Sequence, residues 1–152
     1  MKERFVIRRI MMFKNNVTDK EKFSDDTGLK GSALHVDDIE HLKFETYDID
    51  GRKGVSIFYL YDARRDARGA VAALVRYARG ALTPRHTHLG WELVLVLKGE
   101  LVDDRGQHSA GALQVYPPGS THQLSSPSGC TFLVVWEQPV KPVEFQDEGA
   151  AV

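Results

Sequence analysis

Apolar and polar residues alternate in short stretches through the C-terminal two thirds of the chain. From Gly54 onward these stretches are rich in β-branched and aromatic residues, and a turn signal interrupts them roughly every 8 to 12 residues. No window of about 12 residues in this part carries the apolar period of 3.6 that marks a helix. The pattern predicts an all-β fold, with strands over residues 55–61, 70–78, 83–88, 92–97, 114–116, 122–125 and 131–137.

Glycine, proline and aspartate mark the expected breaks between these strands. The breaks fall at residues 66–69, 79–80, 99, 103–106, 111, 117–119 and 127–129. Residues 1–30 are polar and charged without a sustained period, which indicates a loosely held arm, and residues 34–50 contain one or two short edge strands. We therefore expect one domain, with the arm and edge strands over residues 1–50 and a barrel over residues 51–152.

Composition narrows the functional classes. The chain has 152 residues, of which 42% are hydrophobic and 27% charged, and its formal net charge is -1. This balance favours a soluble globular protein and gives no long-range attraction to nucleic acid or to a membrane surface. Cys130 is the single cysteine, so no intrachain disulfide forms. The basic N-terminus is interrupted by Arg8 and Arg9 and does not match a signal peptide, so we expect a cytoplasmic protein.

Histidine, glutamate and glycine are regularly spaced between Gly80 and Gly99, in the segment GALTPRHTHLGWELVLVLKG. Residues two apart on a strand point to the same face, so His86 and His88 can both point inward. Glu92 keeps the same parity. Two imidazoles and a carboxylate on one wall are suitable ligands for a divalent first-row metal ion.

A second regular segment is GALQVYPPGSTH, residues 111–122. Pro117 and Gly119 favour a tight turn, because proline fixes φ and glycine accepts a positive φ. The turn places His122 at the start of the next strand, from which it can complete the metal site. The predicted ligands of one divalent metal ion per chain are His86, His88, Glu92 and His122.

The two segments match both motifs of the cupin superfamily, G-x5-H-x-H-x3-E-x6-G and G-x5-P-x-G-x2-H. More narrowly, residues 55–140 resemble the cupin domain of ChrR-type anti-sigma factors and its free-standing single-domain relatives. The resemblance implies a jelly-roll barrel, also called a double-stranded β-helix. It also implies one metal ion, which is zinc in this branch and iron, manganese or nickel in others.

The chain departs from the family pattern at two points. The longer second motif ends in an asparagine where this chain has Ser126, which removes at most a turn or outer-shell hydrogen bond. ChrR-type anti-sigma factors also carry an N-terminal helical zinc domain built on one histidine and two cysteines. This chain has no cysteine before Cys130, so binding of a sigma factor is not expected.

Two functions remain open, because fold analogy does not choose between them. The first is a small metal enzyme, in its sharpest form an oxygenase acting on a diketone or a similar oxygenated molecule. The second is a non-catalytic metal-dependent module that binds or senses a small ligand, with a metal-free barrel as a minor third case. No catalytic acid or base can be assigned, and only Tyr116, Gln123 and Glu92 itself are candidates.

Other chemistry-bearing side chains have simpler interpretations. We expect His35, His41 and His108 to lie outside the site, and Arg76 and Arg85 to be exposed rather than anion-binding. Trp91 and Trp136 suit the core or an interface, and Cys130 suits the core. Val94, Val96 and Leu124 are expected to line an apolar interior.

Strand parity around Glu92 predicts a homodimer. If Glu92 points inward, the opposite face carries Trp91, Leu93, Leu95 and Leu97, all apolar, where a half-exposed strand would alternate. The strand over 131–137 repeats this, with Phe132, Val134 and Trp136 on one side and Leu133 and Val135 on the other. An exposed patch of that size is unusual on a monomer. A second subunit, assisted by the apolar cluster in residues 5–13, would bury it.

Overall fold

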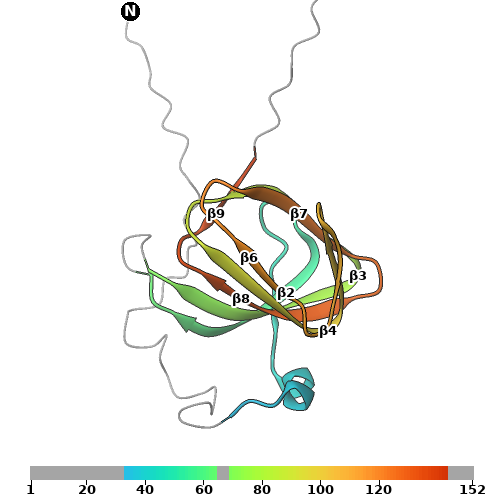
Figure 1. Ribbon diagram of the computed structural model, residues 1–152. Helices are drawn as coiled ribbons and strands as arrows, with labels where there is room; N and C mark the ends of the chain where they lie inside the picture. Colours follow the sequence, from blue (N-terminus) through green and yellow to red (C-terminus); the bar gives the residue numbers. More distant parts are fainter. Residues whose placement is uncertain (1–32, 65–68, 144–152) are drawn as a thin grey trace, which may run out of the picture.

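The computed structural model describes residues 33–64 and 69–143, which form a β-barrel preceded by one short helix (Figure 1). The arm expected over residues 1–30 lies outside the described residues. A 3₁₀ helix, η2 (Val36–His41), leads to the strands. These are β1 (Glu45–Thr46), β2 (Lys53–Asp62), β3 (Val71–His88), β4 (Glu92–Asp103), β5 (Gly106–Ser109), β6 (Leu113–Tyr116), β7 (Thr121–Ser126), β8 (Cys130–Trp136) and β9 (Val140–Pro142). None of the helices within the described ranges is long and apolar enough to cross a membrane.

Antiparallel pairing closes the strands into a barrel. The first half of β3 pairs with β8 and its second half with β7. In the same way, the first half of β4 pairs with β8, and Val102 near its end pairs with Ser125 of β7. The circuit β3–β7–β4–β8 is therefore continuous, while β1, β2, β5, β6 and β9 extend its two walls. This arrangement confirms the predicted all-β jelly roll.

Two of the predicted breaks are bends within continuous strands. β3 runs for 18 residues through Gly80, and β4 runs for 12 residues through Gly99. Both glycines have positive φ, 77° and 72°, which other residues rarely adopt. A Cβ on Gly99 would also lie 2.2 Å from the carbonyl oxygen of Gly129. The prediction that strands end at 79–80 and 99 was wrong, because these glycines turn each strand from one wall to the other without stopping its pairing.

The interior is filled by inward-facing residues of the long strands. Val94, Val96 and Leu101 of β4 are at most 1% exposed, and Phe132 packs edge-to-face on Tyr77 with ring centroids 5.3 Å apart. Cys130 belongs to this buried cluster, as predicted. β3 ends, and β4 and β7 begin, at the same end of the barrel, so the residues carried there come together.

Candidate metal centre

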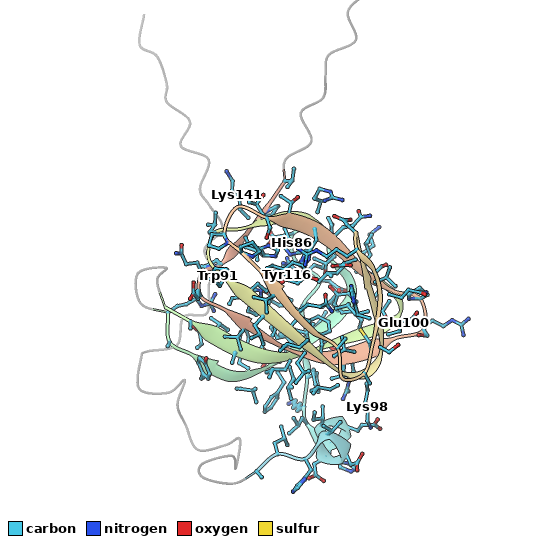
Figure 2. The ribbon with its side chains drawn as sticks, viewed as in Figure 1. His86, Trp91, Lys98, Glu100, Tyr116 and Lys141 are labelled. Carbon is cyan, nitrogen blue, oxygen red and sulfur yellow. The ribbon has the colours of Figure 1, made fainter. Side chains whose placement is uncertain are left out.

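The four predicted metal ligands converge inside one end of the barrel. His86 and His88 come from the end of β3, Glu92 begins β4, and His122 of β7 lies directly opposite His86 in the strand pairing. All four are at most 4% exposed, and one possible ligand atom from each lies within 4.8 Å of all the others. Figure 2 shows His86 in the barrel interior and Trp91 at its periphery. These residues could therefore hold one metal ion.

The distances between donor atoms match those around a single ion. His86 Nε2 lies 2.9 Å from His122 Nε2, and Glu92 Oε1 lies 3.3 Å from His88 Nε2 and 3.5 Å from His122 Nε2. Two donors that are each about 2.1 Å from a shared ion, at angles of about 90–110°, are about 3.0–3.4 Å apart. The donors are therefore arranged around a space of the size that one first-row ion occupies.

Hydrogen bonds on the far side of two imidazoles fix which nitrogen faces this space. His86 Nδ1 donates to the carbonyl oxygen of Pro84 at 2.9 Å. Ser120 Oγ donates its own hydrogen to Pro117 O at 2.6 Å, so it accepts one from His88 Nδ1 at 2.9 Å. With the proton on Nδ1, each ring presents the lone pair of Nε2 to the space between the donors.

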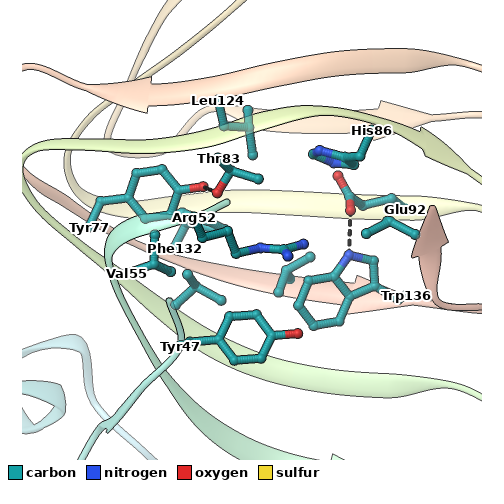
Figure 3. Close-up of a pocket in the computed structure, with 13 residues that line it drawn as sticks. Tyr47, Arg52, Val55, Tyr77, Thr83, His86, Glu92, Leu124, Phe132 and Trp136 are labelled. Atoms are coloured by element: carbon teal, nitrogen blue, oxygen red, sulfur yellow. Dashed lines mark hydrogen bonds between the residues drawn. The ribbon is translucent and has the colours of Figure 1, made fainter. Parts of the chain in front are cut away.

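The carboxylate of Glu92 is oriented in the same manner. Trp136 lies opposite Glu92 in the β4–β8 pairing, and its indole Nε1 donates a hydrogen bond to Glu92 Oε2 (Figure 3). This leaves Oε1 directed toward the histidines. Trp136, which the sequence assigned to the core or an interface, therefore holds a candidate ligand in place.

Unpaired buried atoms support a bound cation. Glu92 Oε1 and His88 Nε2 are buried and form no hydrogen bond to any residue that the structure describes. An unsatisfied buried polar atom costs about 1–3 kcal/mol. A metal ion would bind both atoms, so the donor set fits the group that the fold family carries. His122 Nδ1 is also buried and unpaired within the described ranges, and the ion gives no account of it.

The protonation states suit metal binding. Burial lowers the pKa of His86, and it lowers the pKa of His122 to about 4. Burial acts to raise the pKa of Glu92, but His88 and His122 outweigh it and the pKa lies below its usual value. At neutral pH His86 and His122 are neutral and Glu92 is ionised, as ligation requires.

A cavity adjoins the site inside the barrel. The cavity is partly open to solvent, and His86 and Glu92 contribute to its wall. The predicted Leu124 lines it, whereas Val94 and Val96 belong to the buried core and do not contribute to the lining. Sequence reasoning missed four polar residues of the lining, and these have no motif around them: Tyr47, Arg52, Tyr77 and Thr83 (Figure 3).

The two other acid–base candidates do not reach the cavity. The ring of Tyr116 packs 4.3 Å from the His122 ring, but its hydroxyl donates to Asp103 Oδ2 at 2.7 Å. Gln123 is exposed to solvent. Neither residue contributes to the cavity lining, so neither is placed to act on a molecule bound there.

The remaining histidines lie outside the site as expected, whereas Arg76 and Arg85 are half-buried rather than exposed. His35 and His41 are exposed. His108 pairs with Asp103 at 2.8 Å, away from the metal cluster. Arg85 forms a two-point ion pair with Asp104, and Arg76 stacks over the ring of Phe44 at 4.0 Å. Ser126, at the departure from the family motif, is fully buried and donates to Glu100 O at 2.6 Å.

An antiparallel jelly roll with three histidines and a glutamate at one end defines a cupin barrel. Residues 33–140 match the family described as the ChrR cupin-like domain, and the chain belongs to that family. A comparison with curated proteins finds no significant match.

Solved structures share the fold at low sequence identity. The polyketide cyclase RemF from Streptomyces resistomycificus is 24% identical, with a TM-score of 0.61 over 77% of this chain and 88% of that one. An acetylacetone dioxygenase from Acinetobacter johnsonii is 13% identical, with a TM-score of 0.62 over 79% and 81%. A chain in the complex of Rhodobacter sphaeroides SigE with the anti-sigma ChrR is 23% identical, with a TM-score of 0.56, and the match covers 80% of this chain and 61% of that one.

Proposed function

We propose that the protein is a metal-dependent oxygenase whose ion is held by His86, His88, Glu92 and His122 and is chelated by a small oxygenated substrate. The observation that carries this proposal is that two of these residues, His86 and Glu92, line the cavity. A molecule bound in the cavity therefore lies beside the donors. Three imidazoles and one carboxylate leave one or two positions open on a five- or six-coordinate ion, and no sulfur ligand closes the site.

The chain orients the candidate metal ligands and surrounds the site with apolar side chains. A bound iron ion would supply a Lewis acid and a site for O₂. Val55, Leu124 and Phe132 give the cavity apolar walls. Trp136, Pro84 and Ser120 hold the candidate ligands from behind, so that donor positions are fixed before a substrate arrives. The shared fold with the acetylacetone dioxygenase from Acinetobacter johnsonii supports this reaction class.

A second function is favoured by the protonation states of the side chains that line the cavity. Apart from His86 and Glu92, the titratable groups lining it are Tyr47, Tyr77 and Arg52. Burial raises the pKa of both phenols, and arginine is always protonated, so none of the three is a base at neutral pH. A non-catalytic module that binds or senses a small ligand requires no such base, and the ChrR family match supports that alternative.

Metal analysis and oxygen uptake separate the two functions. The protein is purified without added metal, analysed for bound ions, stripped, and reloaded with iron(II). We expect O₂ consumption when a diketone or hydroxy acid is added, and none with His88→Ala, whereas the exposed-site control His41→Ala keeps the activity. If no compound starts O₂ uptake while the spectrum of the cobalt-loaded protein still shifts on adding it, the binding-only function holds.

A further inference from the structure

Arg52 places a positive charge in the wall of the cavity. It follows a tight turn in which its backbone N–H donates to Ile49 O at 2.9 Å, and the intervening Asp50 and Gly51 both have positive φ. The residue is only 8% exposed and lines the same cavity as His86 and Glu92. Figure 3 shows its guanidinium group extending into the pocket in the direction of Glu92 and Trp136.

The guanidinium of Arg52 is only partly satisfied by its own turn. Nη1 donates to Ile49 O and to Asp50 Oδ2, both at 3.2 Å, and the group lies 5.2 Å from the centroid of the Tyr47 ring. Arginine has five N–H donors, and Nε and Nη2 have no hydrogen-bond partner within the described ranges. The Asp50 side chain is 45% exposed, so solvent screens the one ion pair that Arg52 makes.

Glu92 does not neutralise Arg52. Its Oε2 accepts the hydrogen bond of Trp136, and its Oε1 faces His88 and His122. Among the residues that the structure describes, no ion pair joins Arg52 to Glu92. A divalent ion at the donors, together with Arg52 and Glu92, leaves the cavity with a net positive charge. A largely buried guanidinium whose only ion pair is with a half-exposed carboxylate favours an anionic ligand.

The turn that carries Arg52 contacts the segment that holds His86. A Cβ on Gly51 would lie 3.1 Å from Pro84 Cγ, and Pro84 O accepts the hydrogen bond of His86 Nδ1. The backbone around Pro84 therefore contacts the turn before Arg52 and also orients the candidate ligand His86. A fixed guanidinium fork suits the two oxygens of a carboxylate better than a single point charge does.

We propose that the cavity selects small keto- or hydroxy-carboxylates, whose carboxylate pairs with Arg52 while a second oxygen reaches the ion held by the His/Glu cluster. This inference rests on the proposed function, because it assumes that a cavity ligand reaches the metal. Arg52 acts as a specificity-determining residue, and neutral diketones bind more weakly than their carboxylate counterparts.

The test compares two probes that differ in charge, acetoacetate and methyl acetoacetate, on the full-length cobalt(II)-loaded protein. We expect the wild type to bind acetoacetate about tenfold to a hundredfold more tightly than the ester, the range expected for a hydrogen bond to a charged group. Because the ion itself also attracts an anion, Arg52→Met should reduce this preference without abolishing it, with the ester affinity unchanged, and Arg52→Lys should reduce it less. Arg85→Met, which removes an arginine outside the cavity, should keep all of it. A preference as large in Arg52→Met as in the wild type overturns the inference.

Calorimetry on the metal-free protein separates this inference from the proposed function. Weak acetoacetate binding that Arg52→Met removes supports the carboxylate site, even if the cobalt spectrum never responds to either probe. That combination would contradict the proposed function alone, because the ligand would not reach the ion. Absence of any Arg52-dependent binding, with and without metal, overturns the carboxylate site. Thermal unfolding of Arg52→Met and Arg52→Lys checks that both variants remain folded.

Discussion

The two faces of β4 show how one strand serves two environments. Its inner face carries Glu92, Val94 and Val96, which are at most 3% exposed. Its outer face carries Leu93, Leu95 and Leu97, which are only half-buried. Between residues 92 and 97 the inner face contains the polar residue and the outer face contains none, the reverse of an ordinary half-exposed strand.

The outer face continues as two apolar rows across neighbouring strands. Pairing aligns Val115, Leu93, Val135 and Ala72 in one row, and Leu113, Leu95, Leu133, Leu74 and Phe58 in the next. At the β2–β3 end, Arg76 donates to Ile39 O at 3.2 Å and Phe44 contacts Phe58, so η2 and the segment after it cover the rows there. At the other end, Leu113 is 60% and Val115 is 46% exposed.

The comparison of the two faces shows that a buried polar atom without a hydrogen bond and an exposed apolar patch each indicate a binding site. On the inner face the unpaired atoms of Glu92 and His88 are suited to an ion. On the outer face the rows over β4, β6 and β8 are suited to a second copy of the chain, packed about a two-fold axis. The homodimer stays a prediction, and the apolar cluster in residues 5–13 lies outside the described residues.

The largest effect is expected from preventing metal binding on the inner face. The double variant His88→Ala, His122→Ala should lose bound metal, and with free metal at 100–1000 times its Kd the unfolding free energy should fall by about 3–4 kcal/mol through linkage. Metal analysis and denaturant unfolding with and without chelator measure both quantities. His41→Ala is the control. Full metal occupancy in the double variant would end the assignment of the site.

The predicted dimer is tested by placing a charged residue at the centre of the two apolar rows on the outer face. Leu95→Glu should raise the dimer Kd by about two orders of magnitude, because an unpaired charge would be buried in the interface. Sedimentation velocity at micromolar concentration measures this, with Gln123→Glu on an exposed position of β7 as control. A wild-type protein that sediments as a 17.1 kDa monomer shows that the dimer prediction is wrong.

A smaller effect is expected from loosening Glu92. Trp136→Phe keeps the apolar ring but removes the donor to Oε2, and loss of such an orienting hydrogen bond reduces metal affinity about 10–100-fold. Competition with a chromophoric chelator measures the change. Trp91→Phe is the matched control, because Trp91 is 49% exposed outside the barrel. Equal affinities in the two variants would show that the indole does not orient the ligand.

The smallest effect concerns Asp103, which accepts a hydrogen bond from Tyr116. Burial acts to raise the pKa of Asp103, but Tyr116 and His108 outweigh it, so its pKa is lowered. A lowered pKa stabilises the fold above the unfolded value of about 3.9, and this contribution is lost as pH falls through the folded pKa. Tyr116→Phe in metal-free protein should cost about 1–3 kcal/mol at neutral pH and less below about pH 4. Denaturant unfolding at both pH values measures it against Tyr61→Phe, and a pH-independent loss would contradict this account.

The group of four candidate metal ligands could be predicted from the sequence because its signals are local. His86, His88 and Glu92 lie close together along one strand and its successor, and the Pro117–Gly119 turn marks His122. Arg52 could not be predicted, because it reaches the cavity only through the pairing of β1, β2 and β3 and has no motif around it. In the same way Gly80 and Gly99 signalled a positive φ, but only the pairing on both sides shows whether a strand ends or bends there. β5 and β9 lack the apolar alternation that made the other strands visible.

The long path of β3 through both walls has a consequence for the order of folding. His86, His88 and Glu92 are neighbours in sequence and can approach each other early in folding. His122 meets them only after β7 has paired with the second half of β3, and contacts between distant segments form slowly. The complete donor set therefore exists only once the barrel has closed. The rate at which a refolding chain acquires a chelator-resistant ion should report that closing step, separately from the rate at which its strands first appear.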